Sequence, residues 1–186
     1  MNNSKYRLIA LIGKSGSGKD TILKEVLKNE NFHSVVGVTT RPPRENEQEG
    51  IDYYFIDTDT FTKLLFDNKL IEATSFNGWG YGTPYSSLSA NKINIAVLNP
   101  AGIEILRDNS HIDLTVIYIN VSDKIRLIRQ LSREENPNIQ EIIRRYSVDE
   151  EDFNPNVINE LIDYTAVNED IIDLNSIVTA IIEGQF

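Results

Sequence analysis

The stretch GKSGSGKDT, residues 13–21, decides the fold class because it has the spacing of a phosphate-binding loop. A nearly continuous apolar run, YRLIALI at residues 6–12, precedes it and is typical of a strand buried on both faces. Residues 21–29, TILKEVLKN, follow with apolar side chains at helical spacing. Strand, glycine turn and helix in this order are the context in which such a loop binds phosphate.

Each residue type in the loop has a physical role in holding phosphate. Glycines let backbone N–H groups turn toward phosphate oxygens, and the start of the helix adds the positive end of its dipole. The lysine is a point charge for the β and γ phosphates of a nucleoside triphosphate. The residues predicted to bind ATP here are Gly13, Ser15, Gly16, Ser17, Gly18, Lys19, Asp20 and Thr21.

Asp20 departs from the usual loop, in which a serine or threonine hydroxyl after the lysine binds magnesium. A carboxylate is also a good magnesium ligand, so the substitution is compatible with a working site. We therefore predict ATP and Mg²⁺ as the cofactors, with Asp20 as the metal ligand. Thr21 also offers a hydroxyl, but its side chain is expected to point in another direction on the helix.

Composition and charge exclude several classes of function. A chain of 186 residues suits one domain, and its net charge of −10 argues against a binder of nucleic acid or anionic membranes. The absence of cysteine excludes disulfides and thiolate zinc sites. No stretch approaches the roughly 20 apolar residues that span a bilayer, and the N-terminus is unlike a signal peptide. We expect a cytoplasmic protein that is a monomer or homodimer.

The rest of the chain alternates between strand-like and helix-like segments, which indicates an α/β domain with a mainly parallel sheet. Predicted strands lie at residues 33–40, 53–57, 93–99, 114–121 and 164–167, with a hairpin at 70–83. Predicted helices lie at residues 57–68, 100–108, 122–133, 139–153 and 171–183. The hairpin region, about residues 41–83, is expected to be an insertion.

A second motif, TTRPPRENEQEGIDYYF at residues 39–55, carries two arginines and a tyrosine. Arg41 and Arg44 are three apart on a proline-stiffened loop, which places both guanidinium groups within reach of one phosphate. Tyr53 can donate a third hydrogen bond. A third motif, LIEATSFNGWGYGT at residues 70–83, follows in the hairpin.

Together these motifs resemble the guanylate kinase family, in order and over nearly the whole chain, ending with VNED near the C-terminus. The resemblance implies a P-loop NTPase three-layer fold in one domain, residues 1–186. It divides that domain into a core at about 1–40 and 84–186, a small GMP-binding lobe at about 41–83, and a short helical lid at about 130–150. The implied reaction is transfer of the ATP γ-phosphoryl group to GMP or dGMP.

The resemblance also implies roles for individual residues. Those expected to bind the acceptor nucleotide are Arg41, Arg44, Tyr53, Glu72, Tyr81 and Thr83. Those expected to be catalytic are Lys19, Arg133 and Arg145, with Arg129 and Arg144 as neighbours and Asn168 near the adenine of ATP. A carboxylate at Glu72 suits guanine, because it can accept from the N1–H and the exocyclic amine together. The lid arginines lie on helices rich in acidic residues, so surface ion pairs are the alternative.

Three departures from the family pattern keep other acceptors open. Val97 and Asn99 replace two carboxylates at the end of a strand, Gly37 replaces a hydroxyl that contacts the base, and the lid has fewer positive charges. We expect Asp20 to take over the metal-binding role of the lost carboxylate. The alternatives are a kinase for ribose 1,5-bisphosphate or for another nucleoside monophosphate, and a non-catalytic binding module of the same fold. The intact arginine–tyrosine cluster argues against the ribose 1,5-bisphosphate kinase, and Lys19 with its glycines argues against the binding module, whereas another nucleoside monophosphate stays open.

Overall fold

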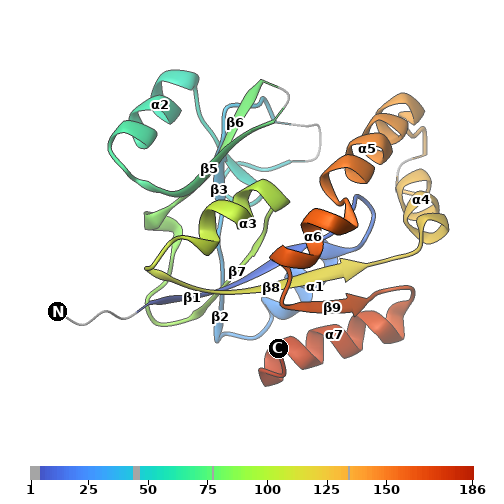
Figure 1. Cartoon of the computed structure of the whole chain (residues 1–186). Coiled ribbons are helices and arrows are strands. Elements are labelled where there is room, and N and C mark those ends of the chain that lie inside the picture. Colours follow the sequence, from blue (N-terminus) through green and yellow to red (C-terminus); the bar gives the residue numbers. More distant parts are fainter. Residues whose placement is uncertain (1–4, 44–46, 77, 134) are drawn as a thin grey trace.

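Five parallel strands form the central sheet, in the order β2-β7-β1-β8-β9 (Figure 1). The structure is a computed structural model that describes residues 5–43, 47–76, 78–133 and 135–186, so the predicted phosphate ligand Arg44 lies outside the described residues. The strands of this sheet are β1 (Tyr6–Ile12), β2 (Phe32–Ser34), β7 (Ile93–Val97), β8 (Ile112–Asn120) and β9 (Tyr164–Val167).

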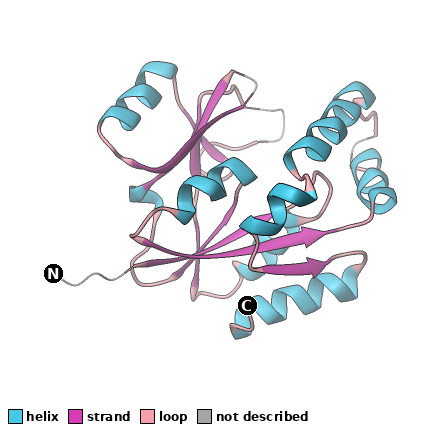
Figure 2. Ribbon diagram, viewed as in Figure 1, coloured by secondary structure: helices cyan, strands magenta, loops and turns pink. Residues whose placement is uncertain are grey.

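Helices cover both faces of this sheet and make a three-layer domain, as Figure 2 shows. One face is covered by α1 (Lys19–Val26) and α7 (Ile171–Glu183), and the other by α3 (Pro100–Arg107) and α6 (Pro155–Leu161). The predicted three-layer α/β fold with a parallel central sheet is therefore confirmed.

The middle strand β1 shows why its sequence is apolar without interruption. Leu11 packs in the cluster that contains Ile22 of α1, whereas its neighbour Ala10 packs on the opposite face with Ile103 of α3. Because successive side chains of a strand point to opposite faces, a strand covered on both faces must be apolar at nearly every position. This arrangement places β1, and the loop that follows it, in the middle of the domain.

A second, mixed sheet with the strand order β4-β3-β6-β5 forms a lobe beside the core (Figure 1). Its elements are β3 (Gly37–Thr39), β4 (Tyr53–Phe55), α2 (Thr58–Phe66), β5 (Leu70–Phe76) and β6 (Trp79–Pro84). The predicted hairpin is the antiparallel pair β5–β6. Asp57 caps α2 by accepting from the Thr60 N–H at 2.6 Å.

The single strand predicted at residues 33–40 is wrong, because the chain passes from one sheet to the other within it. β2 pairs with β7 in the central sheet, and β3 pairs with β6 in the lobe. Val35 keeps the first sheet's hydrogen bonding by donating to the Ile95 carbonyl at 3.0 Å. Both halves have strand-forming side chains, so the change of partner leaves no local signal.

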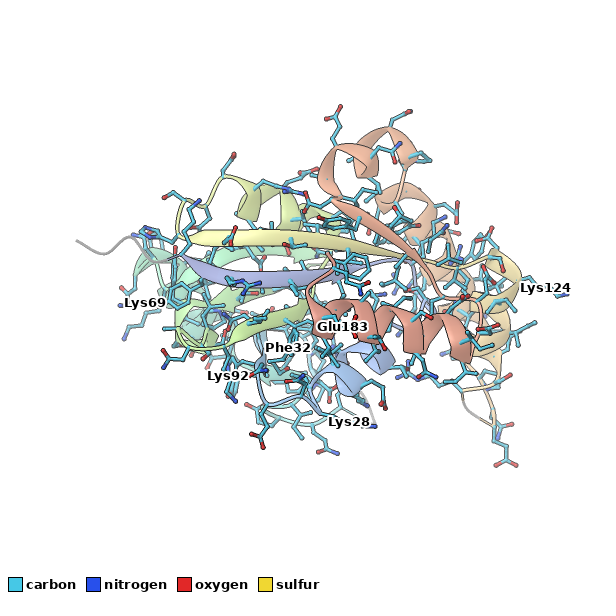
Figure 3. All side chains as sticks on the ribbon, turned by 90° about the horizontal axis from the view of Figure 1, so that it is seen from below. Lys28, Phe32, Lys69, Lys92, Lys124 and Glu183 are labelled. Atoms are coloured by element: carbon cyan, nitrogen blue, oxygen red, sulfur yellow. The ribbon has the colours of Figure 1, made fainter. Side chains whose placement is uncertain are left out.

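Two helices, α4 (Asp123–Leu131) and α5 (Ile139–Asp152), lie on the side of the domain away from α2, where the lid is predicted, and are called the lid below (Figure 1). A single 3₁₀ turn, η1 (Tyr85–Ser87), follows β6. Figure 3 shows Lys124 of α4 and Lys69, just before β5, at opposite ends of the molecule. Across the described ranges, none of the helices combines the length and the apolar character that crossing a membrane requires.

Candidate active site

The phosphate-binding loop, residues 13–18, lies between the end of β1 and the start of α1. Its glycines are needed because neighbouring backbone and side chains approach closely. A Cβ at Gly16 would lie 2.5 Å from the Arg126 carbonyl oxygen, and one at Gly18 would lie 2.5 Å from Asn168 Nδ2. Both glycines have positive φ, 82° and 91°, which other residues rarely adopt. The loop is therefore shaped by the lid and by the segment after β9.

Several N–H groups of the loop remain open to a ligand. The Ser15 N–H donates to Asp149 Oδ2 and the Ser17 N–H donates to the Lys14 carbonyl. The N–H groups of Gly16, Gly18 and Lys19 have no acceptor among the described residues. Open N–H groups at the start of a helix are a binding site for an anion such as phosphate.

Lys19 lies over this loop and is held by the loop's own oxygens. Its Nζ donates to the Gly13 carbonyl at 2.6 Å, the Lys14 carbonyl at 3.2 Å and Ser17 Oγ at 3.3 Å. Burial lowers the pKa of the Lys19 ammonium, while the charges of Asp20 and Asp149 act to raise it. Asp20 and Thr21 are exposed on the first turn of α1. The site thus combines open N–H groups, a cation and one free carboxylate.

Asn168, expected near adenine, supports the loop from behind. It is 1% exposed, and its Nδ2 donates to the Ser17 carbonyl at 2.7 Å. Its Oδ1 is buried and has no partner among the described residues. An orphaned buried amide oxygen is costly unless a donor reaches it, so this atom is an acceptor that the described residues leave unused.

The lid residues differ in how close they come to the loop. Arg133 lies beyond the end of α4 and is exposed, with no side-chain partner found in the described part of the chain. Arg145 Nε donates to Glu141 Oε1 at 2.8 Å, and Arg144 also pairs with Glu141. Hydrogen bonds from these two arginines hold the pKa of Glu141 at about 2. In this conformation Arg144 and Arg145 form surface ion pairs, the alternative to direct contact with the transferring phosphoryl group.

Two residues of α4 contact the loop and were not among the predicted catalytic residues. Arg129 Nη1 donates to the Gly16 carbonyl at 3.5 Å, and Gln130 Nε2 donates to the Ser15 carbonyl at 3.3 Å. Their spacing from Arg126 puts all three on one face of the helix, which is the signal that identifies them. Gln130 carries no charge, so a search for phosphate-binding cations passes over it.

The lobe gathers one arginine and two tyrosines. Arg41 Nε donates to the Tyr81 hydroxyl at 3.2 Å, and the Arg41 guanidinium lies 5.8 Å from the centre of the Tyr53 ring. The two tyrosine rings meet edge to face at 5.9 Å. Burial raises the pKa of Tyr53 to about 12, so its hydroxyl stays a donor. The predicted residues Arg41, Tyr53 and Tyr81 converge.

Glu47 orients this arginine and was not predicted. It accepts from Arg41 Nη1 and Nη2 at 2.8 and 2.9 Å, a bidentate ion pair in which both side chains are largely buried. Such a pair fixes the plane of the guanidinium. The only signal in the sequence is an acidic side chain six residues after Arg41.

Glu72 and Thr83 form a buried polar pair between the lobe and the core. The Thr83 hydroxyl donates to Glu72 Oε1 at 2.6 Å, and the two residues are 3% and 6% exposed, in that order. Burial raises the pKa of Glu72 to about 7, although the bond from Thr83 acts against this shift. The other oxygen of Glu72 faces Gly102 at the start of α3. This pair can accept N–H groups from a base that enters beside α3.

The loop, the lobe and the lid face one another. The charge of Asp20 contributes to raising the pKa of Tyr53, and Tyr81 contributes to raising the pKa of Arg144. Electrostatic effects of this kind require the groups to be near each other. The loop with Lys19 on the core, the arginine–tyrosine cluster on the lobe, and Arg144 on α5 therefore lie within electrostatic range of one another.

Comparison with known proteins identifies this arrangement. A family model described as guanylate kinase matches residues 5–185. The chain belongs to the guanylate kinase family. A guanylate kinase from Thermobifida fusca is 33% identical over 149 residues, 77% of this chain and 76% of that protein. One from Prochlorococcus marinus is 46% identical over 90 residues, and the match spans about half, 48%, of each chain. A crystal structure of guanylate kinase from Anaplasma phagocytophilum has a TM-score of 0.66 at 26% identity, covering 98% of this chain and 87% of that one.

The positions that depart from the guanylate kinase pattern have defined places in the fold. A Cβ at Gly37 would lie 3.0 Å from the Gly82 carbonyl, so close pairing of β3 and β6 leaves little room for a hydroxyl side chain. Asn99 caps α3, since its Oδ1 accepts from the Gly102 N–H at 2.7 Å. Val97 ends β7 beside Leu11 of β1, one residue before the end of that strand. Val97, the position of a lost carboxylate, thus lies at the carboxyl end of the parallel strands, where β1 leads into the loop and then to Asp20 on α1.

Proposed function

We propose that this member of the guanylate kinase family transfers the γ-phosphoryl group of ATP to GMP or dGMP, forming GDP or dGDP. The observations that support the proposal are the open N–H groups and Lys19 on the core, and the converging side chains of Arg41, Tyr53 and Tyr81 on the lobe. Two nucleotides bound at these two places would bring the donor and acceptor phosphates together for in-line transfer. Positioning and charge neutralisation are sufficient for this reaction, without a covalent intermediate.

The chain's residues divide the work between donor and acceptor. The open N–H groups of the loop and Lys19 bind the polyphosphate of ATP, and Asn168 Oδ1 is an acceptor for the adenine amine. Arg41, Tyr53 and Tyr81, with Arg44, hold the phosphate of GMP. Glu72 and Thr83 recognise guanine. Arg145 and Arg133 turn toward the transferring group when the lid closes, and closure excludes water.

The residues around Asp20 suit a magnesium ion that arrives with the nucleotide. No group of three or more metal-ligating side chains occurs in the described ranges, and Asp20 supplies one exposed carboxylate beside Lys19. Magnesium typically takes one or two carboxylates, phosphate oxygens and several waters, which this site can satisfy. Bound there, the ion would neutralise charge on the β and γ phosphates.

Asp20→Ala should weaken magnesium binding and catalysis together. Loss of one charged ligand is expected to raise the magnesium concentration needed for half-maximal activity about tenfold. Titrating magnesium into the complex with ADP by calorimetry measures the same loss without turnover. Asp20→Ala combined with Val97→Asp should recover part of the affinity, because Val97 ends β7 beside Leu11 of β1, the strand that leads into the loop and α1. An unchanged magnesium requirement in Asp20→Ala would refute the relocated metal ligand.

The affinity for GMP should fall as the pH is lowered through neutrality. Burial raises the pKa of Glu72 to about 7, and only the ionised carboxylate accepts from both donors of guanine. Above the pKa the binding form dominates, and below it the protonated form does. Between about pH 8 and about pH 6, the apparent Kd for GMP should rise about tenfold, as expected for a single titrating group.

Glu72→Gln is the control for this pH dependence, because the phosphate of GMP also titrates near about pH 6. The variant binds GMP more weakly but retains the contribution of the nucleotide. Subtracting its pH profile from that of the wild type, measured by calorimetry, isolates the titration of Glu72. Identical slopes in the two proteins would show that Glu72 does not recognise guanine.

A coupled assay that compares acceptors tests the function itself. We expect turnover of GMP and dGMP with ATP, and little with AMP, UMP or ribose 1,5-bisphosphate. A preference for ribose 1,5-bisphosphate would show that the lobe binds a sugar phosphate. If no ADP formed with any of these acceptors, the kinase assignment would be contradicted. Size-exclusion chromatography with light scattering distinguishes a monomer of 21.1 kDa from a homodimer.

A further inference from the structure

A carboxylate that none of the roles above requires fastens the lid helix α5 to the phosphate-binding loop. Asp149 Oδ2 accepts from the Ser15 N–H at 2.7 Å, and Asp149 Oδ1 accepts from the Ser15 hydroxyl at 3.3 Å. Asp149 is buried and lies 134 residues from Ser15 in the sequence. Hydrogen bonds to a charged acceptor are stronger than neutral ones, so these two bonds link two distant segments of the chain strongly. The contact of Asp149 with Ser15 is called the joint below.

Arg126 of α4 holds the same carboxylate from the other side. The side chain of Arg126 is fully buried, and its Nη1 donates to Asp149 Oδ2 at 3.1 Å. Its Nη2 donates to Glu150 Oε1 at 2.7 Å, and the Tyr146 ring centre lies 4.1 Å from its Cζ. A buried guanidinium is tolerated only with such partners. Arg126, Asp149 and Ser15 therefore form one chain of contacts through α4, α5 and the loop.

This joint affects the shape and the charge of the loop. It turns the Ser15 N–H toward α5, while the N–H groups of Gly16, Gly18 and Lys19 stay open to phosphate. Burial lowers the pKa of Lys19, and the charge of Asp149 acts against this effect. Arg126 neutralises Asp149, so the carboxylate does not repel the incoming polyphosphate strongly.

The joint also sets the position of Arg145. Arg145 lies four residues before Asp149 on α5, so the two side chains share one face of the helix and are one turn apart. Glu141, one turn further, lies on the same face and holds Arg145. Anchoring Asp149 on the loop therefore ties the part of α5 that carries Arg145 to the loop.

We propose that Asp149 is a positioning residue for ATP. By holding Ser15 and the base of α5, it keeps the loop in its phosphate-binding shape and keeps Arg145 within reach of the γ-phosphoryl group. The inference rests on the proposed function, since it takes ATP as the ligand of the loop. Asp149 acts through Ser15 and α5 without touching the nucleotide.

Calorimetry with ADP and, separately, with GMP tests this role in wild type and three variants. Asp149→Ala should weaken ADP binding about tenfold, the loss expected for one charge-assisted hydrogen bond, and leave GMP binding unchanged. It should also lower kcat, because α5 loses its anchor. Asp149→Asn keeps an acceptor for the Ser15 N–H and should recover most of the ADP affinity. Glu151→Gln, exposed on the same helix, should match the wild type.

The outcomes that overturn the proposal are distinct. A folded Asp149→Ala variant that binds ADP as tightly as the wild type, or more tightly, contradicts it. If Asp149→Ala weakened the binding of ADP and of GMP equally, the cause would be a general loss of structure. If Asp149→Asn bound ADP as weakly as Asp149→Ala, the charge of Asp149 would matter and its hydrogen bond to Ser15 would not. Circular dichroism and the melting temperature check folding, and Asp149→Ser replaces an alanine variant that does not fold. Failure of the proposed function looks different, since the wild type itself would not bind ADP or GMP.

Discussion

Replacing Lys19 with methionine should lower kcat for GMP phosphorylation about a thousandfold, because removal of one preorganised charge at the transferring group has effects of this order. Methionine keeps much of the apolar stem, so the main change is loss of the ammonium that three loop oxygens now hold. ADP affinity should fall much less than kcat, since the open N–H groups of the loop remain.

Lys24→Met is the matched control for this variant. Lys24 lies on the last turn of the same helix, is exposed, and changes the net charge by the same amount when replaced. Its kcat should equal that of the wild type. Single-turnover formation of GDP, followed by rapid quench, reports the chemical step directly. If Lys19→Met turned over nearly as fast as Lys24→Met, the loop would not be the donor site.

Replacing Arg41 with methionine should raise the KM for GMP about a hundredfold, because it removes one charge-assisted hydrogen bond and a full positive charge beside the phosphate. The guanidinium is held between Glu47 and the Tyr81 hydroxyl, so it is oriented before the nucleotide arrives. The KM for ATP should not change, because the donor site lies on the core. Steady-state kinetics with each substrate varied separately distinguishes these two effects.

Arg7→Met controls for charge and folding in this experiment, since Arg7 is an exposed residue of β1. A second comparison uses Arg41→Lys, which keeps the charge but loses the planar fork, and it should resemble Arg41→Met more than the wild type. If Arg41→Met raised both KM values equally, the lobe would not be specific to the acceptor.

Elements with several agreeing local signals could be predicted closely from the sequence. The last strand and the last helix lie at the predicted residues, β9 at Tyr164–Val167 and α7 at Ile171–Glu183. Asp170 accepts from the N–H groups of the first turn of α7, and Gly184 ends the helix with a φ of 70°. Capping at both ends defines a helix independently of its packing.

Other elements depend on partners that are distant in the chain and could not be predicted. The helix α6 was missed, although Asn154 caps it and Pro155 starts it, because seven residues show too little periodicity. The change of sheet near Val35 is visible only once β7 and β6 are in place. A local sequence pattern indicates whether a segment forms a strand, but pairing with distant strands decides which sheet the segment joins.

The candidate site residues also differ in whether a local motif or a distant contact predicts them. Lys19, Arg41 and Tyr53 belong to short sequence motifs, so the spacing of those motifs and the family resemblance predicted them. Glu47 and Asp149 serve through their contacts with Arg41 and Ser15, and such supporting residues have no motif of their own. They become visible only when the folded chain brings the partners together.

Placement of the aromatic residues gives the lobe a property of its own. Trp79 is the single tryptophan of the chain and lies on β6, where it is 40% exposed. Intrinsic fluorescence excited at the indole band therefore originates entirely in the lobe. This tryptophan can report movement of the lobe without any added label. Stopped-flow fluorescence can therefore test whether the lobe moves when nucleotides bind, with no tryptophan signal from the core.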